Sequence, residues 1–354
     1  MMNAFDVGTE QPAADFFPSV GFAPRDQHDR DSLDYAKKGR NERNPAIAKI
    51  GLEKGTPGYA LRDVALNVGS NAHRADNEVR FPWDGPAVTS PEKRGVSRWT
   101  GTPEEATNMV RAAAHFFGSP KIGVIQIDSD IKKLFFPSGT KFTDGDVAYI
   151  DKDAPPSNFA KGRNTYSPVK VLPNKAKYII VFAVQQPVEM TKRGNTQQQL
   201  GASIRYANAP LIGARIQAFL KTLGYQALTD MGSGSGQGSW GWSNVAFGSL
   251  CGNGELSRIG MLMSHEWGPA GIYGQGIVTD LELAPTNPID AGMFRFCKVC
   301  KTCGTTCNEI NGWSPINMDD EPTWDPSGPW NRVGKKAYPM DWTRCMFCPY
   351  CQGT

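Results

Sequence analysis

Cysteine spacing constrains this chain more than any other feature of its sequence. Seven of its eight cysteines lie within the last 58 of 354 residues, whereas Cys251 stands apart. The cysteines of disulfide-linked proteins are usually spread over the whole fold that they cross-link, whereas thiols three residues apart suit a metal centre. The pattern therefore predicts metal ligation by the following residues: Cys297, Cys300, Cys303, Cys307, Cys345, Cys348 and Cys351.

The two cysteine runs predict two iron–sulfur clusters. The run C-x2-C-x2-C-x3-C from Cys297 to Cys307 has ferredoxin spacing, in which three thiolates hold one cluster and the fourth reaches a second. The run from Cys345 to Cys351 supplies three thiolates that complete one 4Fe-4S cluster with Cys307. The remaining ligand of the first cluster is expected four residues after Cys351, one residue past Thr354. We therefore interpret the sequence as a fragment.

Other ligand sets and another metal stay open. The first cluster is otherwise a three-iron species or has a different ligand. Cys251 is a candidate for that ligand, although its place in an apolar run favours a buried structural thiol. Zinc is the alternative metal because two CxxC pairs hold it tetrahedrally, but seven thiolates exceed what one zinc ion needs.

Composition excludes several classes of function. With 40% hydrophobic and 21% charged residues, the chain is typical of one large or two medium globular domains. A net charge of +3, with evenly scattered Lys and Arg, is too small for a nucleic-acid surface. We therefore expect a small-molecule substrate and no nucleic acid. The longest apolar runs, such as 178–184, are far shorter than the roughly 18 to 20 residues of a membrane-spanning helix.

Periodicity predicts helices that alternate with buried strands. Residues 102–117 begin with a Thr-Pro-Glu-Glu helix start and continue at helical period. Segments 122–127 and 178–184 are apolar runs typical of buried strands. An amphipathic helix follows at 204–223, with Gly224 as its C-cap. The alternation indicates a layered α/β domain.

Two regions have little periodicity. Residues 1 to about 95 are rich in Pro, Gly, Asp and Arg, which predicts an extended wrapping segment with short helices. Residues 232–241 (GSGSGQGSWG) form a loop that is a plain surface loop, a linker or a segment that closes over a ligand by backbone contact. Residues 245–250 return to a buried element. The chain has no convincing GxGxxG or Walker A phosphate cradle.

Five short segments occur in a fixed order ahead of the first cysteine run. They are WTGTPEE (99–105), LGY (223–225), GNGELSR (252–258), VTDLEL (278–283) and PID (288–290). Together with the cysteine runs, they resemble the corrinoid-dependent reductive dehalogenases of organohalide respiration. The first hundred residues match that family only loosely.

The resemblance implies an α/β (α+β) architecture. It consists of a nitroreductase-like corrinoid-binding domain followed by a ferredoxin-like domain with two 4Fe-4S clusters. On this chain, residues 1–97 become the N-terminal wrapping segment, 98–292 the catalytic domain and 293–354 the iron–sulfur domain, truncated at its C-terminus. Such enzymes hold the corrinoid (a cobalamin-type cofactor) without a histidine below cobalt, and none of the four histidines here lies in a D-x-H-x-x-G box.

The family's catalytic tyrosine lies on the helix before the LGY segment. Tyr206 occupies that place, which implies that it is the proton donor. A neighbouring cation has to assist a phenol, and Arg205 and Arg215 are candidates, although helical spacing puts Arg205 on another face. Alternatively, Tyr206 is an ordinary core tyrosine. Ser233 and Tyr273 replace the family's usual asparagine and arginine in the corrinoid and substrate pocket, so substrate orientation is expected to differ.

The resemblance also implies a route for electrons and a cellular setting. Electrons enter at the outer cluster, pass through the cluster of the second cysteine run and reduce the corrinoid to Co(I). The carbon–halogen bond then breaks and Tyr206 protonates the carbon. The implied partners are an electron donor protein or quinol-linked chain and a small membrane anchor, at the outer face of the cytoplasmic membrane after twin-arginine export. No export signal is visible, so a cytoplasmic location stays open.

Two rival functions remain. An epoxyqueuosine reductase-like enzyme combines the same cofactors but acts on a modified transfer-RNA base. It needs a basic cleft, which the net charge of +3 does little to support. A non-catalytic iron–sulfur electron carrier is the second rival, and it predicts iron without cobalt.

Overall fold

The centre of the fold is a four-stranded antiparallel sheet with the strand order β1-β4-β8-β5. The structure, a computed structural model, describes residues 42–71, 83, 86–135, 140–145, 170–196, 199, 203–229, 242, 244–324, 336–341, 344–346 and 348–353. The strands of the central sheet are β1 (Ile122–Gln126), β4 (Tyr178–Gln185), β5 (Ala227–Thr229) and β8 (Gly271–Thr279).

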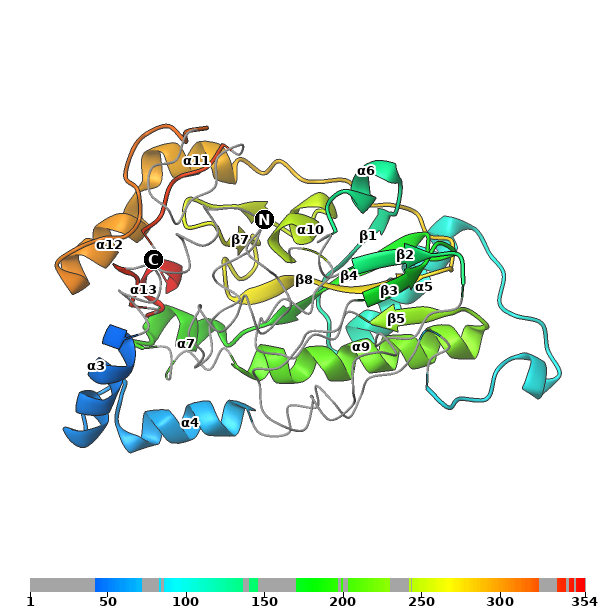
Figure 1. Cartoon of the computed structure of the whole chain (residues 1–354), viewed down its shortest axis with the longest axis horizontal. Helices are drawn as coiled ribbons and strands as arrows, with labels where there is room; N and C mark the ends of the chain where they lie inside the picture. Colours follow the sequence, from blue (N-terminus) through cyan, green and yellow to red (C-terminus); the bar gives the residue numbers. More distant parts are fainter. Residues whose placement is uncertain are drawn as a thin grey trace.

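Helices cover both faces of this sheet, so β4 is buried along nearly its whole length. Alternate residues point to opposite faces: Ile180 and Phe182 pack against α5 and α9, whereas Ile179 and Val181 face α10. Figure 1 shows α9 along one side of the sheet and α10 on the other. These helices are α5 (Pro103–Phe116), α9 (Ser203–Leu223) and α10 (Asn244–Leu250).

The elements predicted for this core are confirmed. Helix α5 begins at a capping box, in which the Thr102 side chain accepts from the Glu105 N–H and the Glu105 carboxylate accepts from the Thr102 N–H. Helix α9 is followed by Gly224 at a φ of 94°, the left-handed conformation of a C-cap glycine. Strands β1 and β4 match their predicted ranges to within one residue. An antiparallel sheet with helices on its faces makes this an α+β arrangement.

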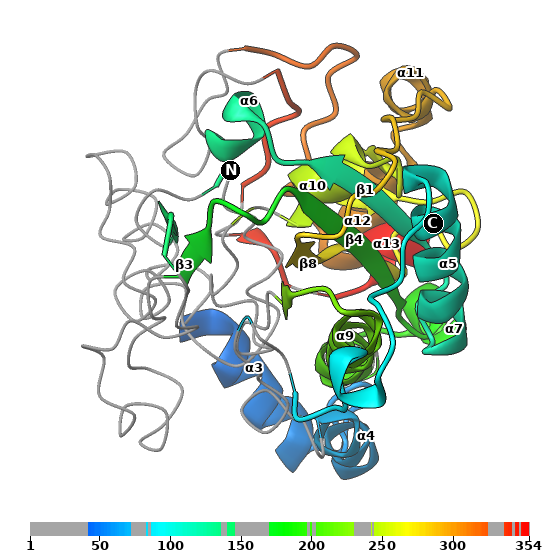
Figure 2. The same cartoon turned by 90° about the vertical axis from the view of Figure 1, so that its right-hand side faces the viewer.

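The cysteine-bearing helices gather at one end of the molecule (Figure 1). There, α13 packs between α12 and α7. Helix α4 packs against α9, and Figure 2 shows it on the side of α9 away from the sheet. Within the described ranges, no helix is both long and apolar enough to cross a membrane. The helices at this end are α3 (Glu42–Glu53), α4 (Leu61–Asn71), α7 (Val188–Arg193), α11 (Met293–Cys300), α12 (Thr302–Asn311) and α13 (Tyr350–Gly353).

Smaller elements complete the fold. Short helices predicted before residue 95 are present as α3, α4 and a single 3-10 turn. Two separate two-stranded sheets pair β2 with β3 in parallel and β6 with β7 in antiparallel orientation. These elements are the 3-10 turn η3 (Glu92–Arg94), α6 (Ser129–Lys132), β2 (Thr140–Thr143), β3 (Lys170–Pro173), β6 (Glu255–Leu256) and β7 (Leu262–Met263).

Gly274 marks the closest approach of α10 to β8. A Cβ atom at this position would lie 1.9 Å from the Asn244 carbonyl oxygen and 2.4 Å from its carbonyl carbon, so backbone would have to move. We expect Gly274→Ala to lower the free energy of unfolding by about 2 to 4 kcal/mol, as strained core substitutions do. Urea unfolding followed by circular dichroism measures this change.

Gly69 provides the control for that experiment. It lies in α4, where an added Cβ meets nothing within 4 Å. Gly69→Ala should therefore be neutral or stabilise the protein by up to about 1 kcal/mol. Equal unfolding midpoints for the Gly274→Ala variant and the unsubstituted protein would contradict the close contact.

Candidate functional site

The first cysteine run forms two helices that are joined at Lys301. Helix α11 carries Cys297 and Cys300, and α12 carries Cys303 and Cys307. Lys301 has a φ of 49°, a left-handed conformation that turns the chain between the helices. The spacings of three residues on α11 and four on α12 keep the two thiols of each helix on one face. The turn therefore brings the thiol of Cys303 near those of Cys297 and Cys300.

The second cysteine run meets the first at α13. Cys351 lies on α13, which packs against α12. Thiols from both runs thus share one apolar cluster around Ile259 and Met261, in the loop after β6. The members of this cluster are Cys303, Cys307, Cys345, Cys351, Ile259, Met261, Ile316 and Met340.

Burial and neighbouring thiols raise the pKa values of the clustered cysteines. Burial is the main cause for Cys303, whose pKa rises to about 11, and nearby Cys297 and Cys300 add to the shift. Burial also raises the pKa of Cys351 well above its ordinary range, and its further neighbours are Cys345, Cys348, Cys303 and Cys307. Cys303 thus has thiol neighbours in both runs: Cys297 and Cys300 in the first, and Cys351 in the second. These thiols have to lose their protons to bind metal.

Within the described ranges, no three His, Cys, Asp or Glu side chains converge on the position of one metal ion. A structural zinc ion takes four ligands around one point, whereas each thiolate of an iron–sulfur cube binds a different iron.

A helix from the other end of the sequence anchors the second run. On α3, the Arg43 guanidinium and the Asn44 amide both donate to the carbonyl oxygen of Cys345, at 3.1 and 3.2 Å. No motif marks these two residues, and they lie in a segment whose sequence predicts only a wrapping role. The contact places the N-terminal helices beside the thiols.

Tyr206 is buried on α9, with 3% of its surface exposed. Its hydroxyl accepts a hydrogen bond from Nη2 of Arg205 at 3.1 Å, and the guanidinium lies 4.9 Å from the ring centroid. Nη1 of Arg205 donates to the Gly271 carbonyl at 3.1 Å. Arg215 instead approaches the Phe117 carbonyl in an exposed position. Of the two candidate cations, Arg205 is therefore the one beside Tyr206, because its long side chain reaches the tyrosine although helical spacing puts the two residues on different faces.

Ser233 and Tyr273 are the two positions expected in the corrinoid pocket. Ser233 lies outside the described residues. Tyr273 lies on β8, where the register with β4 shifts between Phe182 and Val184, so that Tyr273 and Gly274 stand opposite one residue. This irregularity is a β-bulge, which bends a strand and is common beside functional sites.

Cys251 belongs to a different part of the core from the other thiols. It is 3% exposed and belongs to the apolar cluster between α10 and the sheet. The clustered thiols of the two cysteine runs belong to the other apolar cluster, around Ile259 and Met261. Burial raises the pKa of Cys251 from 9.0 to about 12. Its surroundings therefore fit a structural thiol.

The raised pKa predicts that Cys251 is unreactive. At fixed pH its thiolate is about a thousandfold scarcer than at an ordinary cysteine, and the thiolate is the nucleophile. We expect iodoacetamide at pH 8 to leave Cys251 unlabelled in the folded protein and to label it after unfolding, as read by peptide mass spectrometry. Partly exposed Cys300 is the reactive control in cofactor-free protein. Rapid labelling of Cys251 in the folded state would contradict its burial.

Several known proteins have sequences similar to this chain. Residues 38–283 match the family described as reductive dehalogenase subunit. The chloroethene reductive dehalogenase of Dehalococcoides mccartyi is 33% identical over 292 residues, which cover 76% of this chain and 54% of the relative. The trichloroethene reductive dehalogenase of the same species is 31% identical over 72% of this chain and 48% of its own length. The chain thus spans about half the length of the curated relatives it matches.

Solved structures share the fold. The catabolic reductive dehalogenase NpRdhA aligns with a TM-score of 0.51 and 17% identity over 89% of this chain and 36% of its own. The same protein in complex with 3-bromo-4-hydroxybenzoic acid aligns with a TM-score of 0.53 and 16% identity over 99% of this chain and 42% of its own. At this identity, the likeness concerns the fold alone.

Proposed function

The chain belongs to the reductive dehalogenase family, and from this premise we propose that it removes halide from an organohalide. The observation that carries the proposal is the gathering of thiols from both cysteine runs around one apolar cluster. The reaction consumes two electrons and one proton, replaces the carbon–halogen bond by a carbon–hydrogen bond and releases halide. Iron–sulfur clusters held by these grouped thiolates are suited to deliver electrons one at a time.

We propose that the thiols hold two 4Fe-4S clusters. Cys297, Cys300 and Cys303 supply three ligands of the outer cluster, where electrons enter. Cys307 joins the second run around the inner cluster. This division is supported by the electrostatic interaction of Cys303 with Cys297 and Cys300 and of Cys348 with Cys307, whereas Cys351 interacts with Cys303 as well as with Cys307.

We further propose that a corrinoid binds next to β8. Thr229, Asn244 and Gln275 each carry a buried polar side-chain atom that has no hydrogen-bond partner among the described residues. The first two flank residues 230–243 in the sequence, and the third follows the bulge at Tyr273. A corrinoid ring carries peripheral amides that donate and accept hydrogen bonds, so these side chains fit such a group. When bound, the corrinoid supplies the reduced cobalt at which the carbon–halogen bond is cleaved.

The proposed proton donor is Tyr206. Its hydroxyl is held by Arg205, which is itself fixed by the carbonyl of Gly271. Proton transfer to carbon leaves a phenolate on Tyr206, and the adjacent guanidinium stabilises that negative charge in a buried environment. Ser233 and Tyr273 are proposed to contact the corrinoid or the substrate.

The division into domains follows from the same proposal. Residues 98–292 form the nitroreductase-like corrinoid domain around the central sheet, and residues 293–354 form the ferredoxin-like domain that begins with α11. Residues 1–97 wrap this core, as the packing of α4 on α9 and the contact of α3 with Cys345 suggest. The proposed partners are an electron donor protein or quinol-linked chain and a small membrane anchor, at the outer face of the cytoplasmic membrane.

Metal content tests the proposed function directly. Anaerobic reconstitution with iron, sulfide and cobalamin should give about eight irons and one cobalt per chain. Because the two relatives described above are named for chlorinated ethenes, trichloroethene is the first substrate to assay for chloride release. Iron without cobalt would favour an electron carrier, and zinc alone would overturn the proposal.

A further inference from the structure

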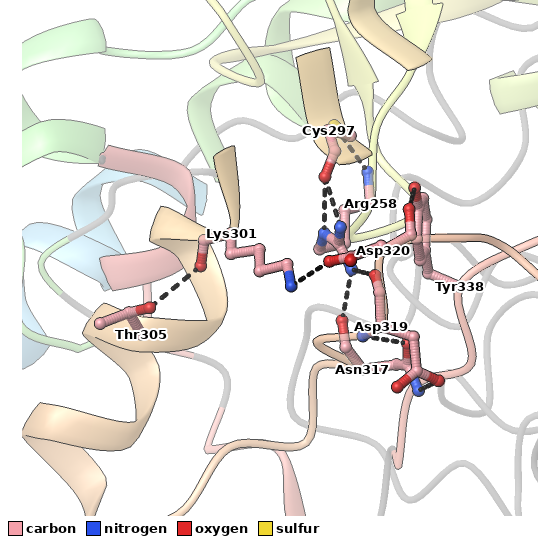
Figure 3. A network of polar contacts seen from close by, with 8 residues as sticks. All are labelled: Arg258, Cys297, Lys301, Thr305, Asn317, Asp319, Asp320 and Tyr338. Carbon is pink, nitrogen blue, oxygen red and sulfur yellow. Dashed lines mark hydrogen bonds and ion pairs between the residues drawn. The ribbon is translucent and has the colours of Figure 1, made fainter. Parts of the chain in front are cut away.

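Arg258 is a buried cation at the border between the catalytic part and the cysteine helices. It is the last residue of the GNGELSR segment and lies in the loop between β6 and β7, with 3% of its surface exposed. Figure 3 shows its side chain between α11 and the chain segment that follows α12. The proposed reaction leaves this residue without a role.

The contacts of Arg258 join three segments of the chain. Its backbone N–H donates to Sγ of Cys297 at 3.3 Å, and its Nε and Nη2 both donate to the carbonyl oxygen of Cys297. Nη1 donates to the carbonyl oxygens of Asn317 and Asp319, both at 2.8 Å. The guanidinium lies 3.9 Å from the ring centroid of Tyr338 (Figure 3). Among the residues that the structure describes, every acceptor of the side chain is thus a neutral backbone carbonyl.

The positive charge of Arg258 is not matched by an ion pair in the part of the chain that the structure describes. The carboxylate of Asp320, which lies nearby in Figure 3, pairs with Lys301 and interacts with Arg258 only through a weaker electrostatic attraction, and Glu321 pairs with Lys298. A buried charge costs several kcal/mol unless it is compensated. Carbonyl dipoles and an aromatic face compensate it in part. An anion beside Cys297 would complete the compensation.

We propose that Arg258 is the counter-cation of the cluster held by Cys297, Cys300 and Cys303, and that it raises the reduction potential of this cluster. This inference rests on the proposed function, which assigns that cluster. A thiolate-ligated iron–sulfur cluster is an anion, and reduction adds a further negative charge. A fixed cation in a low-dielectric environment stabilises the reduced form more than the oxidised form. The N–H bond to Sγ of Cys297 acts in the same direction, because hydrogen bonds to sulfur tune cluster potentials.

An anaerobic redox titration followed by electron paramagnetic resonance tests this role on the whole chain. Arg258→Gln should shift one of the two cluster midpoint potentials to more negative values and leave the other in place. Arg258→Lys retains the charge and should keep the midpoint close to the unsubstituted value. Arg295→Gln is the control. Arg295 lies on α11, the helix that carries Cys297, and its exposed charge is paired with Asp290. Removing this charge should move neither midpoint.

The outcomes separate the two proposals. Loss of iron in Arg258→Gln that is restored in Arg258→Lys would also support a requirement for charge. Unchanged midpoints in iron-replete Arg258→Gln, or equal loss of iron in both variants, would overturn the counter-cation role while leaving the proposed function intact. Absence of both cluster signals from the unsubstituted protein would overturn the proposed function, and the role of Arg258 with it.

Discussion

Replacing Tyr206 with phenylalanine is expected to lower the rate of halide release by about a hundredfold to ten-thousandfold, the usual contribution of a general acid. Phenylalanine retains the buried ring and removes only the hydroxyl that Arg205 holds. Iron and cobalt contents should therefore stay at their unsubstituted values. The measurements are metal analysis and chloride release from the same reconstituted sample.

Tyr225→Phe is the matched control. Tyr225 is also buried, its hydroxyl donates to the Trp99 carbonyl at 2.9 Å, and the Arg98 guanidinium lies 5.3 Å from its ring centroid. Both substitutions remove a hydroxyl that is hydrogen-bonded and cost about 1 to 2 kcal/mol of stability. Only the Tyr206 variant should lose turnover. If the Tyr206 variant turns over at the unsubstituted rate, this residue is an ordinary core tyrosine and leaves the mechanism.

Cys351→Ala is expected to halve the iron content, from about eight to about four per chain, and to abolish halide release. The thiol of Cys351 lies among those of Cys345, Cys348, Cys303 and Cys307, so its loss removes one ligand of the proposed inner cluster. Electrons then have no route from the outer cluster to the substrate. Iron analysis and paramagnetic resonance of the reduced protein measure the loss of one cluster signal.

Cys251→Ala separates cluster loss from a general effect of removing a thiol. Cys251 packs between α10 and the sheet, apart from both thiol groups. Its replacement should cost about 1 kcal/mol of stability through the lost buried atom and leave about eight irons in place. Full iron content in the Cys351 variant would show that this thiol is not a ligand. A loss of iron in the Cys251 variant would support the alternative that Cys251 is a cluster ligand.

Local signals explain why the elements of the core could be predicted. The capping box at Thr102 and the C-cap at Gly224 depend only on neighbouring residues. The apolar run 178–184 indicates a strand that is buried on both faces, because both sets of alternate side chains are hydrophobic. Sequence patterns of this range carry no information about which strands pair. The order β1-β4-β8-β5 and its registers come from the structure alone.

Long side chains explain part of what the sequence could not predict at the site. Helical spacing describes the directions of Cα–Cβ bonds, and by that measure Arg205 and Tyr206 point apart. The arginine side chain is long enough to fold back over the ring of its own neighbour. The contacts of Arg258 and Arg43 could not be predicted for a related reason. Both side chains donate to backbone carbonyls, and the spacing of the cysteines does not indicate such contacts.

The contact between α3 and Cys345 has a consequence for the order in which the protein folds. It joins residues that are 302 and 301 positions apart, whereas all four cysteines of the first run lie within 11 residues of the sequence, from Cys297 to Cys307. Contacts between distant residues form slowly, because loop closure costs entropy before any contact compensates it. We therefore expect the first thiol group to assemble early and α3 to dock late. The interval between these events is the time in which iron and sulfide enter the site most easily.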